Sequence, residues 1–539
     1  MNLQAHVDLS TVPLGAAIDP KVYGHFLESA FFGNIEGGVY DEGSPRSYPD
    51  GPLQGCRVDV LEACAELGVP VLRWPGGNFT SAYWWQDGVG PKEARPRRLE
   101  LAWGSEESNR FGTPEFLAWC EAVKAEPYLA HSCRSVDDAV RWVEYTNYAG
   151  RTDLADQRRR DGRDAPWAVR LWGLGNEVYG DWQMGHRDVG RYVADAREHA
   201  RFMRAVDPNL QFVAVGHPRE DWTEAVVAGL GESVEYLSLH LYGASEHLVR
   251  PTAAEFEAVV GQAVHFERTI VEYSRQIEAI ADRCGIERPP SIAMDEWNIR
   301  HLEPESWPDP QPGPDGGTAE RQIRTESQAP PRRVNRHSPR TLADALFYAG
   351  VFHAVHRAAR LPVPVAMTNT VNLVNANGLI NVRPDGIVRT ASYWVWDLYH
   401  NHFGTRLTAN TVIAPARYMS ARLSDEDRGP GGDLLTAMTG VSYLDVSSSL
   451  DDAGRLTVAL INRSPAERVD IRLSLDGRHE LPAVGELREL GTATGDLFAV
   501  NTIGDDDRVV LSQPRDVRMD DGVLTVPPHS VTLLTLGIR

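Results

Sequence analysis

Cysteine is scarce in this chain of 539 residues. The five cysteines are odd in number and include no CxxC pair, which argues against both a disulfide framework and a zinc cluster. His25, His131 and His240 could be collected as metal ligands, but no HxH or HExxH spacing supports that reading. We therefore predict core or supporting roles for these histidines, no bound metal and no organic cofactor.

Long apolar runs and an excess of positive charge are also missing. No segment approaches the roughly 18 apolar residues of a membrane span, and MNLQAHVDLSTV at the N-terminus does not resemble a secretory signal. The 75 acidic and 54 basic side chains give a formal charge of -21, which repels phosphate backbones. We expect a soluble, cytoplasmic protein that binds neither nucleic acid nor membrane.

Eight short apolar runs recur along the chain, and segments of helical periodicity separate them. This alternation predicts βα units with a parallel sheet, and eight units indicate a closed (β/α)8 barrel in the α/β class. An open doubly wound sheet is the alternative, but no GxGxxG follows the first strand. The runs are 21–28, 69–78, 126–131, 169–177, 211–216, 234–243, 289–298 and 364–372, and the helical stretches include 54–67, 113–125, 136–149, 187–206, 254–284 and 340–359.

The character of the sequence changes at two places. Residues 301–338 are rich in Pro, Gly, Asp and Arg, which predicts an insertion loop after strand seven, either a disordered surface segment or a lid over the site. Residues 405–539 hold short alternating strands broken by Asp and Gly turns, as in a β-sandwich. This second domain has no chemical motif, so we favour a structural or oligomer-supporting role over carbohydrate binding.

Polar and aromatic residues collect where the predicted strands end, and these ends meet at one mouth of a barrel. Carboxylates, amides and interleaved aromatic rings suit a neutral ligand rich in hydroxyl groups, so the pattern indicates a sugar site. The strand ends carry Glu28, Asn78, His131, Asn176 with Glu177, His240 with Tyr242, Glu296 with Asn298, and Asn372.

Glu177 and Glu296 are the candidate catalytic pair. They end strands four and seven, which lie across the mouth from each other, so their carboxyl groups can flank one glycosidic bond. Glu177 suits the general acid/base and Glu296 the nucleophile. We expect Asp295 to point to the opposite side of the strand from Glu296. A lone Glu at a strand end would more often be an ion-pair partner; the pairing favours catalysis.

Three further positions each allow two interpretations. Asn78 follows a Gly pair in RWPGGNF and is either a ligand contact or part of a plain turn. Glu28 in GHFLE either accepts from sugar hydroxyls or forms a buried ion pair. Tyr242 in HLYG either orients the nucleophile or simply packs. In each case we favour the functional role.

The motifs GHFLE, RWPGGNF, YWWQDGVGP, RPRRLELAWGSEESNRFGT, WVEYTN, LWGLGNEVYGDWQMG and MDEWN resemble the intracellular α-L-arabinofuranosidases of glycoside hydrolase family 51. The similarity runs in order from about residue 20 to 400, and the C-terminal region resembles the sandwich of that family. The resemblance implies a barrel over 19–404 and a sandwich built from residues 1–18 and 405–539.

The resemblance also implies a retaining, exo-acting α-L-arabinofuranosidase that cleaves terminal residues from arabinan or arabinoxylan oligosaccharides, and it suggests a hexamer. It assigns Glu177 as acid/base and Glu296 as nucleophile. It further suggests that Glu28, Asn78, Asn176 and Tyr242 hold the furanose, with Trp103 near the entrance.

Two departures from the family pattern bear on which leaving group the site prefers. Asn372 in VNLVN stands where many members have Gln, and the 301–338 segment is longer than expected.

Two other functions are weighed against the arabinofuranosidase: a hydrolase of the same fold acting on another linkage, such as a β-xylosidase or endoglucanase, and a non-catalytic sugar-binding protein.

Overall fold

The structure is a computed structural model that describes residues 2–15, 17–248, 250–302, 336–414, 417–418, 440–477, 481–519 and 521–538. Most of the predicted 301–338 insertion lies outside these ranges, so its role stays a prediction. Among the described helices, none combines the length and apolar character needed to cross a membrane.

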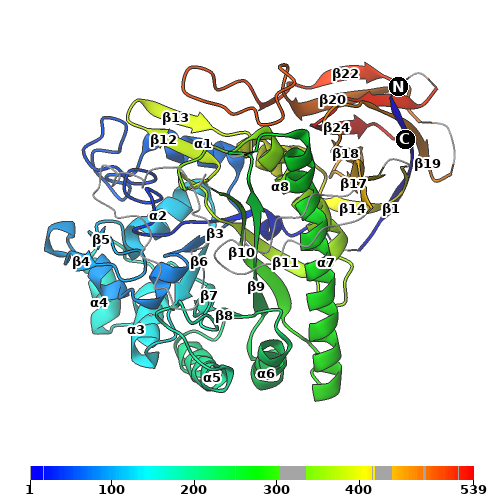
Figure 1. Ribbon diagram of the computed structural model, residues 1–539. Coiled ribbons are helices and arrows are strands. Elements are labelled where there is room, and N and C mark those ends of the chain that lie inside the picture. The colour runs from blue at the N-terminus through cyan, green and yellow to red at the C-terminus, as the bar shows by residue number, and fades with distance from the viewer. Residues whose placement is uncertain are drawn as a thin grey trace.

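A closed barrel of eight parallel strands forms the larger part of the molecule (Figure 1). All eight predicted runs contribute a strand, which confirms the barrel. Their apolar side chains are buried because parallel strands are covered on both faces. The strands are β2 (Gly24–Phe26), β3 (Val71–Trp74), β6 (Glu126–His131), β7 (Leu171–Leu174), β8 (Gln211–Ala214), β9 (Tyr236–Ser245), β10 (Ser291–His301) and β11 (Val365–Thr370).

Helices cover the outside of the barrel. The longest, α7 (Ala253–Cys284), begins where the Thr252 hydroxyl accepts from the Glu255 N–H and ends at Gly285 in the left-handed conformation. The others are α1 (Val58–Leu67), α2 (Thr113–Val123), α3 (Val136–Asn147), α4 (Asp153–Arg160), α5 (Val189–Val206), α6 (Glu220–Leu230), α8 (Leu342–Ala358) and α9 (Tyr393–Trp396). The predicted helical stretches are confirmed, whereas α4 and α6 were not among them.

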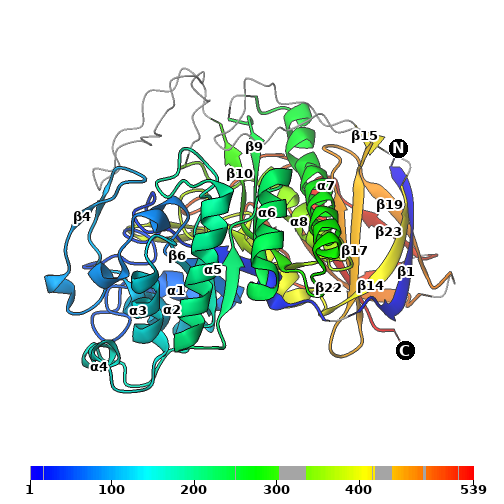
Figure 2. The same cartoon turned by 90° about the horizontal axis from the view of Figure 1, so that it is seen from below.

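The C-terminal region forms a ten-stranded sheet around a core of its own, seen beside the barrel in Figure 2. The N-terminal strand β1 (Leu3–Pro13) joins this sheet between β14 (Arg406–Ile413) and β19 (Val469–Leu475). The remaining strands are β17 (Leu444–Leu450), β18 (Leu456–Asn462), β20 (Val484–Gly491), β21 (Val510–Leu511), β22 (Arg515–Arg518), β23 (Val523–Val526) and β24 (Ser530–Leu536). The barrel-plus-sandwich architecture is thus confirmed, and the boundaries at 18 and 404 stay predictions.

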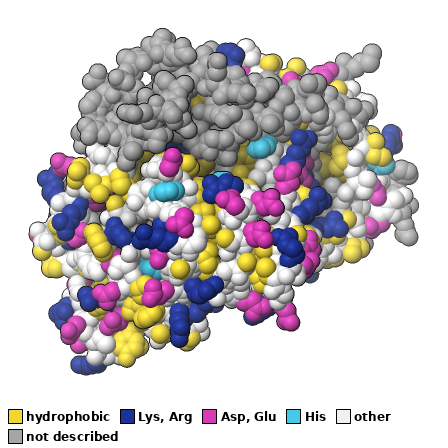
Figure 3. All heavy atoms as spheres, turned by 60° about the horizontal axis from the view of Figure 1, so that its bottom comes forward, with side chains coloured by type: hydrophobic (Ala, Val, Ile, Leu, Met, Phe, Trp, Pro, Cys, Tyr) yellow, Lys and Arg dark blue, Asp and Glu magenta, His cyan; other side chains and the backbone are white. Residues whose placement is uncertain are grey.

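Three short two-stranded sheets lie outside the barrel and the ten-stranded sheet. They pair β4 (Arg98–Leu99) with β5 (Glu106–Glu107), β12 (Ile380–Arg383) with β13 (Gly386–Arg389), and β15 (Arg417–Tyr418) with β16 (Val441–Ser442). On the face shown in Figure 3, acidic and basic side chains are interspersed rather than gathered by sign.

Candidate active site

Glu177 stands just beyond the carboxyl end of β7. The four residues of this strand are fully buried, and the chain turns at Gly175 (φ 99°), whose N–H donates to the His131 carbonyl at 2.7 Å. Glu177 itself has a φ of 45°. Residues other than glycine rarely adopt this left-handed backbone, and such strain concentrates at functional sites.

The Glu177 carboxylate contacts three side chains, one of them the Tyr179 hydroxyl, which donates to Oε1 at 3.5 Å. His240 Nδ1 lies 2.8 Å from Oε1, and Trp182 Nε1 donates to Oε2 at 3.3 Å. Burial works to raise the pKa of Glu177, but the hydrogen bond and charge of His240 outweigh burial and hold that pKa below its usual value.

Glu296 lies on β10, with its carboxylate aimed at the same place. The Tyr242 hydroxyl donates to Oε2 at 2.7 Å, and an Arg73 guanidinium nitrogen lies 3.5 Å from Oε1. Burial raises the pKa of Glu296 above its usual value, and the charge of Glu177 adds to this effect. A deeply buried carboxylate with a directed hydroxyl donor has the surroundings of a functional group rather than a surface ion pair.

His240 on β9 connects the two carboxylates. Its Nδ1 is 2.8 Å from Glu177 and 3.5 Å from Glu296, while Nε2 is 3.4 Å from Asp295. One carboxylate oxygen of each Glu lies within 4.8 Å of the other. Burial disfavours the charged imidazole, but the charge of Glu296, with Asp295 and Glu177, raises the pKa of His240 to about 10.

Asp295 does not point away from Glu296, so that prediction is wrong. Asp295 is 2% exposed, accepts from the Tyr128 hydroxyl at 2.8 Å and lies 3.2 Å from Arg73. The pairing of β10 with β9 is shifted between Ala293 and Glu296. This β-bulge breaks the alternation of the strand, so both carboxylates enter the barrel.

The Gly pair of RWPGGNF brings backbone close to the carboxylates. A Cβ on Gly76 (φ 153°) would lie 2.4 Å from Glu28 Cγ, and a Cβ on Gly77 would lie 2.6 Å from Glu296 Oε1. Only glycine allows this approach. The 3-10 turn that follows (Asn78–Ser81) places Asn78, whose side chain accepts from Gln183 at 3.2 Å.

Asn176 and Glu28 both lie beside the Gly76–Gly77 turn. Asn176 is 1% exposed; its Oδ1 accepts from Arg73 at 2.5 Å, and its buried Nδ2 has no partner among the described residues. Glu28 accepts from the Phe79 N–H at 2.9 Å and from Trp103 Nε1 at 3.1 Å. Burial raises the pKa of Glu28 to about 8.

Asn372 follows β11 and is 2% exposed. Its side-chain amide donates to the Ala376 carbonyl at 3.1 Å. No hydrogen bond or ion pair among the described residues joins it to Glu28, Glu177 or Glu296, and its role in the site stays a prediction.

Two models of known domains match the chain: an α-L-arabinofuranosidase 1 domain over residues 63–258 and an α-L-arabinofuranosidase C-terminal domain over residues 295–530. The chain belongs to the α-L-arabinofuranosidases of glycoside hydrolase family 51. This arabinofuranosidase is therefore a glycoside hydrolase, and the predicted resemblance is confirmed.

Relatives and solved structures agree over nearly the whole chain. α-L-Arabinofuranosidase C of Emericella nidulans is 34% identical over 96% of this chain and 94% of its own length. The arabinose complex of the Thermotoga maritima α-L-arabinofuranosidase has a TM-score of 0.82 at 30% identity, with 99% of both chains covered. A family 44 endoglucanase from Clostridium thermocellum, with a TM-score of 0.55 at 10% identity, shares the fold alone.

Sequence reasoning missed Arg73 in this arabinofuranosidase. Arg73 is 1% exposed and contacts Asp295, Asn176 and Glu296 together. A charged residue inside the apolar run VPVLRW was the available signal, because buried arginines require anionic or amide partners. His240 was treated as a supporting histidine, and its contact with both carboxylates could not be read from spacing.

Proposed function

We propose that this enzyme is a retaining, exo-acting α-L-arabinofuranosidase that works by double displacement. Glu296 attacks C1 of a terminal α-L-arabinofuranosyl residue while Glu177 protonates the glycosidic oxygen, so the bond to the leaving group breaks as the bond to Glu296 forms. Glu177 then removes a proton from water, which attacks C1 and releases L-arabinose and free Glu296.

The separation of the two carboxylates carries this proposal. A retaining mechanism needs carboxyl groups about 5–5.5 Å apart, whereas inversion needs about 6.5–9.5 Å to admit water between them. Oxygens of Glu177 and Glu296 lie within 4.8 Å, which supports direct attack by one carboxylate.

Glycosylation needs the proton on Glu177 and the charge on Glu296. Contact with His240 lowers the pKa of Glu177 in the free site, and burial raises that of Glu296. His240 Nδ1 lies 2.8 Å from Glu177 and 3.5 Å from Glu296. The glycosidic oxygen then replaces His240 as the partner of Glu177, while Tyr242 and Arg73 stabilise charged Glu296.

The furanose is assigned to the pocket bordered by Glu28, Asn78, Asn176 and Tyr242. The partnerless amide of Asn176 and the carboxyl of Glu28 supply a donor and an acceptor for sugar hydroxyls. Trp103, which packs on Phe31 at a ring distance of 4.6 Å, forms an aromatic wall. We also propose that Asn372 contacts the bound substrate, although no hydrogen bond within the described ranges joins it to the catalytic carboxylates.

Membership of the family also supports proposals for the substrate, the assembly and the location. We assign arabinan or arabinoxylan oligosaccharides as substrates; an exo-α-(1→6)-L-arabinofuranosidase of Bifidobacterium longum is 29% identical over 96% of this chain. For the assembly we propose a hexamer, which analytical sedimentation would test. For the location we propose the cytoplasm, which cell fractionation would test.

Two substitutions test the mechanism. Glu177→Ala should still form the arabinosyl-enzyme from 4-nitrophenyl α-L-arabinofuranoside, whose leaving group needs no acid, and azide should rescue its turnover. Glu296→Ala should lose roughly 10³-fold or more on every substrate. Glu106→Ala, an exposed carboxylate, is the matched control.

Product stereochemistry gives an independent check. NMR during hydrolysis should show the α-anomer of arabinose first, because two inversions restore the configuration. First appearance of the β-anomer, or equal losses in both variants with no azide adduct, would overturn the proposal.

A further inference from the structure

A second group of ligand-type side chains lies at the carboxyl end of β6 and on α5. His131 ends β6, Cys133 follows it, and His199 projects from α5, which packs with α3 on the outside of the barrel (Figure 1). One donor atom from each residue lies within 4.8 Å of the other two, and all three residues are buried. In contrast to the expectation from sequence spacing, we propose that these residues bind a thiophilic divalent transition-metal ion such as Zn²⁺.

The hydrogen bond of His199 leaves its other ring nitrogen able to bind an ion. Nδ1 lies 2.7 Å from the Asp195 carbonyl and must donate to it, so Nε2 carries a bare lone pair. Nε2 is buried and has no partner among the described residues, although His199 is only 3% exposed. Fixing one ring nitrogen on a backbone carbonyl and presenting the other is the usual arrangement of a metal-binding histidine.

The carboxylate of Asp138 orients the His131 ring by a hydrogen bond to one of its nitrogens. Nε2 is 3.3 Å from Asp138 Oδ2, and Nδ1 accepts from the Cys133 N–H at 3.0 Å. The proton therefore resides on Nε2, and Nδ1 is the nitrogen that faces Cys133. A carboxylate behind a histidine orients the ring and increases its basicity toward a metal. Binding the ion replaces the hydrogen bond from Cys133.

Charge balance also favours an ion here. Asp138 is 5% exposed, and its Oδ1 has no partner in the described parts of the chain. Arg187, the nearby cation, is paired with Asp195 at 3.2 Å while donating to the Cys133 carbonyl. A divalent ion would be balanced by the Cys133 thiolate and the Asp138 carboxylate, with Arg134 as a further cation within electrostatic reach of Asp138.

The backbone of Cys133 is held in the left-handed region, with a φ of 55°. Such a conformation in a non-glycine residue persists only where the surroundings enforce it. It keeps the Cys133 side chain beside His131 and His199. With metal bonds of about 2.0–2.3 Å, tetrahedral donors lie about 3.3–3.7 Å apart, so the three donor atoms need to approach one another by at most about 1 Å to hold the ion.

The site supports the catalytic strand end without touching substrate. The His131 carbonyl accepts from Gly175, two residues before Glu177. An ion that joins β6 to α5 therefore braces the turn that presents Glu177. We assign it a structural role, and its binding does not depend on the catalytic assignments.

The test uses the full chain with Cys284→Ser, which removes the exposed thiol. We expect one Co²⁺ per chain after dialysis, a thiolate-to-Co²⁺ charge-transfer absorption, and a rise in Tm with Zn²⁺. Cys133→Ser and His199→Gln should lose the bound ion and the Tm rise, and Cys133→Ser should also lose the absorption. Cys120→Ser, a buried thiol outside the group, should change none of these readouts.

The site is overturned by the absence of a bound ion and of the absorption in the parent, or by an absorption that persists in Cys133→Ser. Cys133→Ala and the circular dichroism spectrum distinguish loss of the ligand from loss of the fold. A folded Cys133→Ala variant that keeps the parent stoichiometry also contradicts the proposal.

Discussion

Glu28 is a carboxylic acid that the site keeps protonated near neutral pH. Burial raises its pKa from 4.5 to about 8, although the Phe79 N–H and Trp103 Nε1 both donate to it. The unfolded chain loses this proton near pH 4.5, whereas the folded chain retains it to about pH 8. Stability is therefore lost as pH rises through this interval.

Glu28→Gln removes the titrating carboxyl and with it the loss of folding free energy at high pH, so the variant should be more stable than the parent. Since a tenfold difference in proton affinity is worth about 1.4 kcal/mol, the Tm difference should widen by several degrees between pH 5 and pH 8. Thermal melts at several pH values measure it. Glu106→Gln is the exposed control. A Tm difference that stays constant with pH would contradict the raised pKa of Glu28. The kcat/KM of the variant should fall whichever result is found.

Which residues form the site was only partly predictable from the sequence. Strand ends identified Glu177 and Glu296 because parallel strands deliver their carboxyl ends to one mouth. The direction of the Asp295 side chain was predicted wrongly because it depends on a β-bulge where β10 pairs with β9. Pairing between two strands is not visible in the sequence of either one. Arg73 and His240 were undervalued for the same reason: their partners come from other strands.

The loop after β3 is the element that sets how closely backbone approaches the nucleophile. Gly77→Ala would place a methyl group 2.6 Å from Glu296 Oε1, so the carboxylate must shift from Tyr242. We expect kcat to fall about 10²-fold, because misplacement of reacting groups by about 1 Å costs that much.

Gly386→Ala in β13 is the matched control, since a Cβ there meets nothing within 4 Å. Steady-state kinetics with an aryl arabinofuranoside and thermal melts should separate the two variants. If Gly77→Ala retains the parent kcat, or if its loss tracks a large drop in Tm, the positional explanation is wrong.

At the scale of elements, periodicity predicted strands and long helices but not every connection. The eight strands were recognisable because burial on both faces makes them continuous apolar runs. Helix α4 was missed because its sequence DLADQRRR is almost wholly polar, and Arg158 is buried through carbonyl contacts rather than apolar packing. The 3-10 turn that positions Asn78 has no periodic signal.

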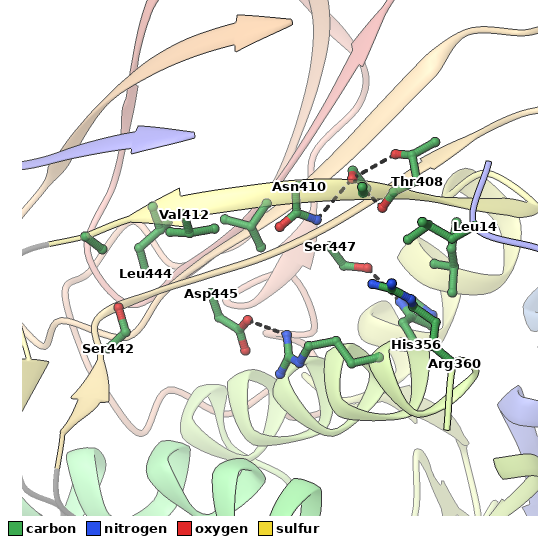
Figure 4. Close-up of a pocket in the computed structure, with 16 residues that line it drawn as sticks. Leu14, His356, Arg360, Thr408, Asn410, Val412, Ser442, Leu444, Asp445 and Ser447 are labelled. Atoms are coloured by element: carbon green, nitrogen blue, oxygen red, sulfur yellow. Dashed lines mark hydrogen bonds and ion pairs between the residues drawn. The ribbon is translucent and has the colours of Figure 1, made fainter. Parts of the chain in front are cut away.

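In the whole molecule, the barrel and the sandwich meet where α8 packs on β17, β18 and β24. Figure 4 shows Asp445 of β17 directed toward this helix beside a cavity of about 350 Å³. Asp445 lies 2.9 Å from Arg357 and 3.4 Å from His353 of α8, and 2.5 Å from Arg463 of the sandwich. One buried carboxylate therefore joins the two domains.

Asp445→Ala should destabilise the whole chain, because it leaves the buried guanidinium of Arg463 without its charged partner, whereas Arg357 keeps its ion pair with Glu267. Removing one member of a buried ion group costs about 3–5 kcal/mol. Burial opposes the charge of Asp445, but Arg357, Arg463 and His353 hold its pKa well below the usual value. The stabilisation is therefore present above about pH 4 and is lost as pH falls.

Urea unfolding at pH 7 measures the loss, with Arg97→Ala, from an exposed pair with Glu106, expected to cost less than about 1 kcal/mol. Since Asp445 links both domains, intrinsic tryptophan fluorescence from the barrel and far-UV circular dichroism should shift together. A sandwich that melts first while the barrel keeps its parent stability would show that the two domains unfold independently, and Asp445 would then stabilise the sandwich alone.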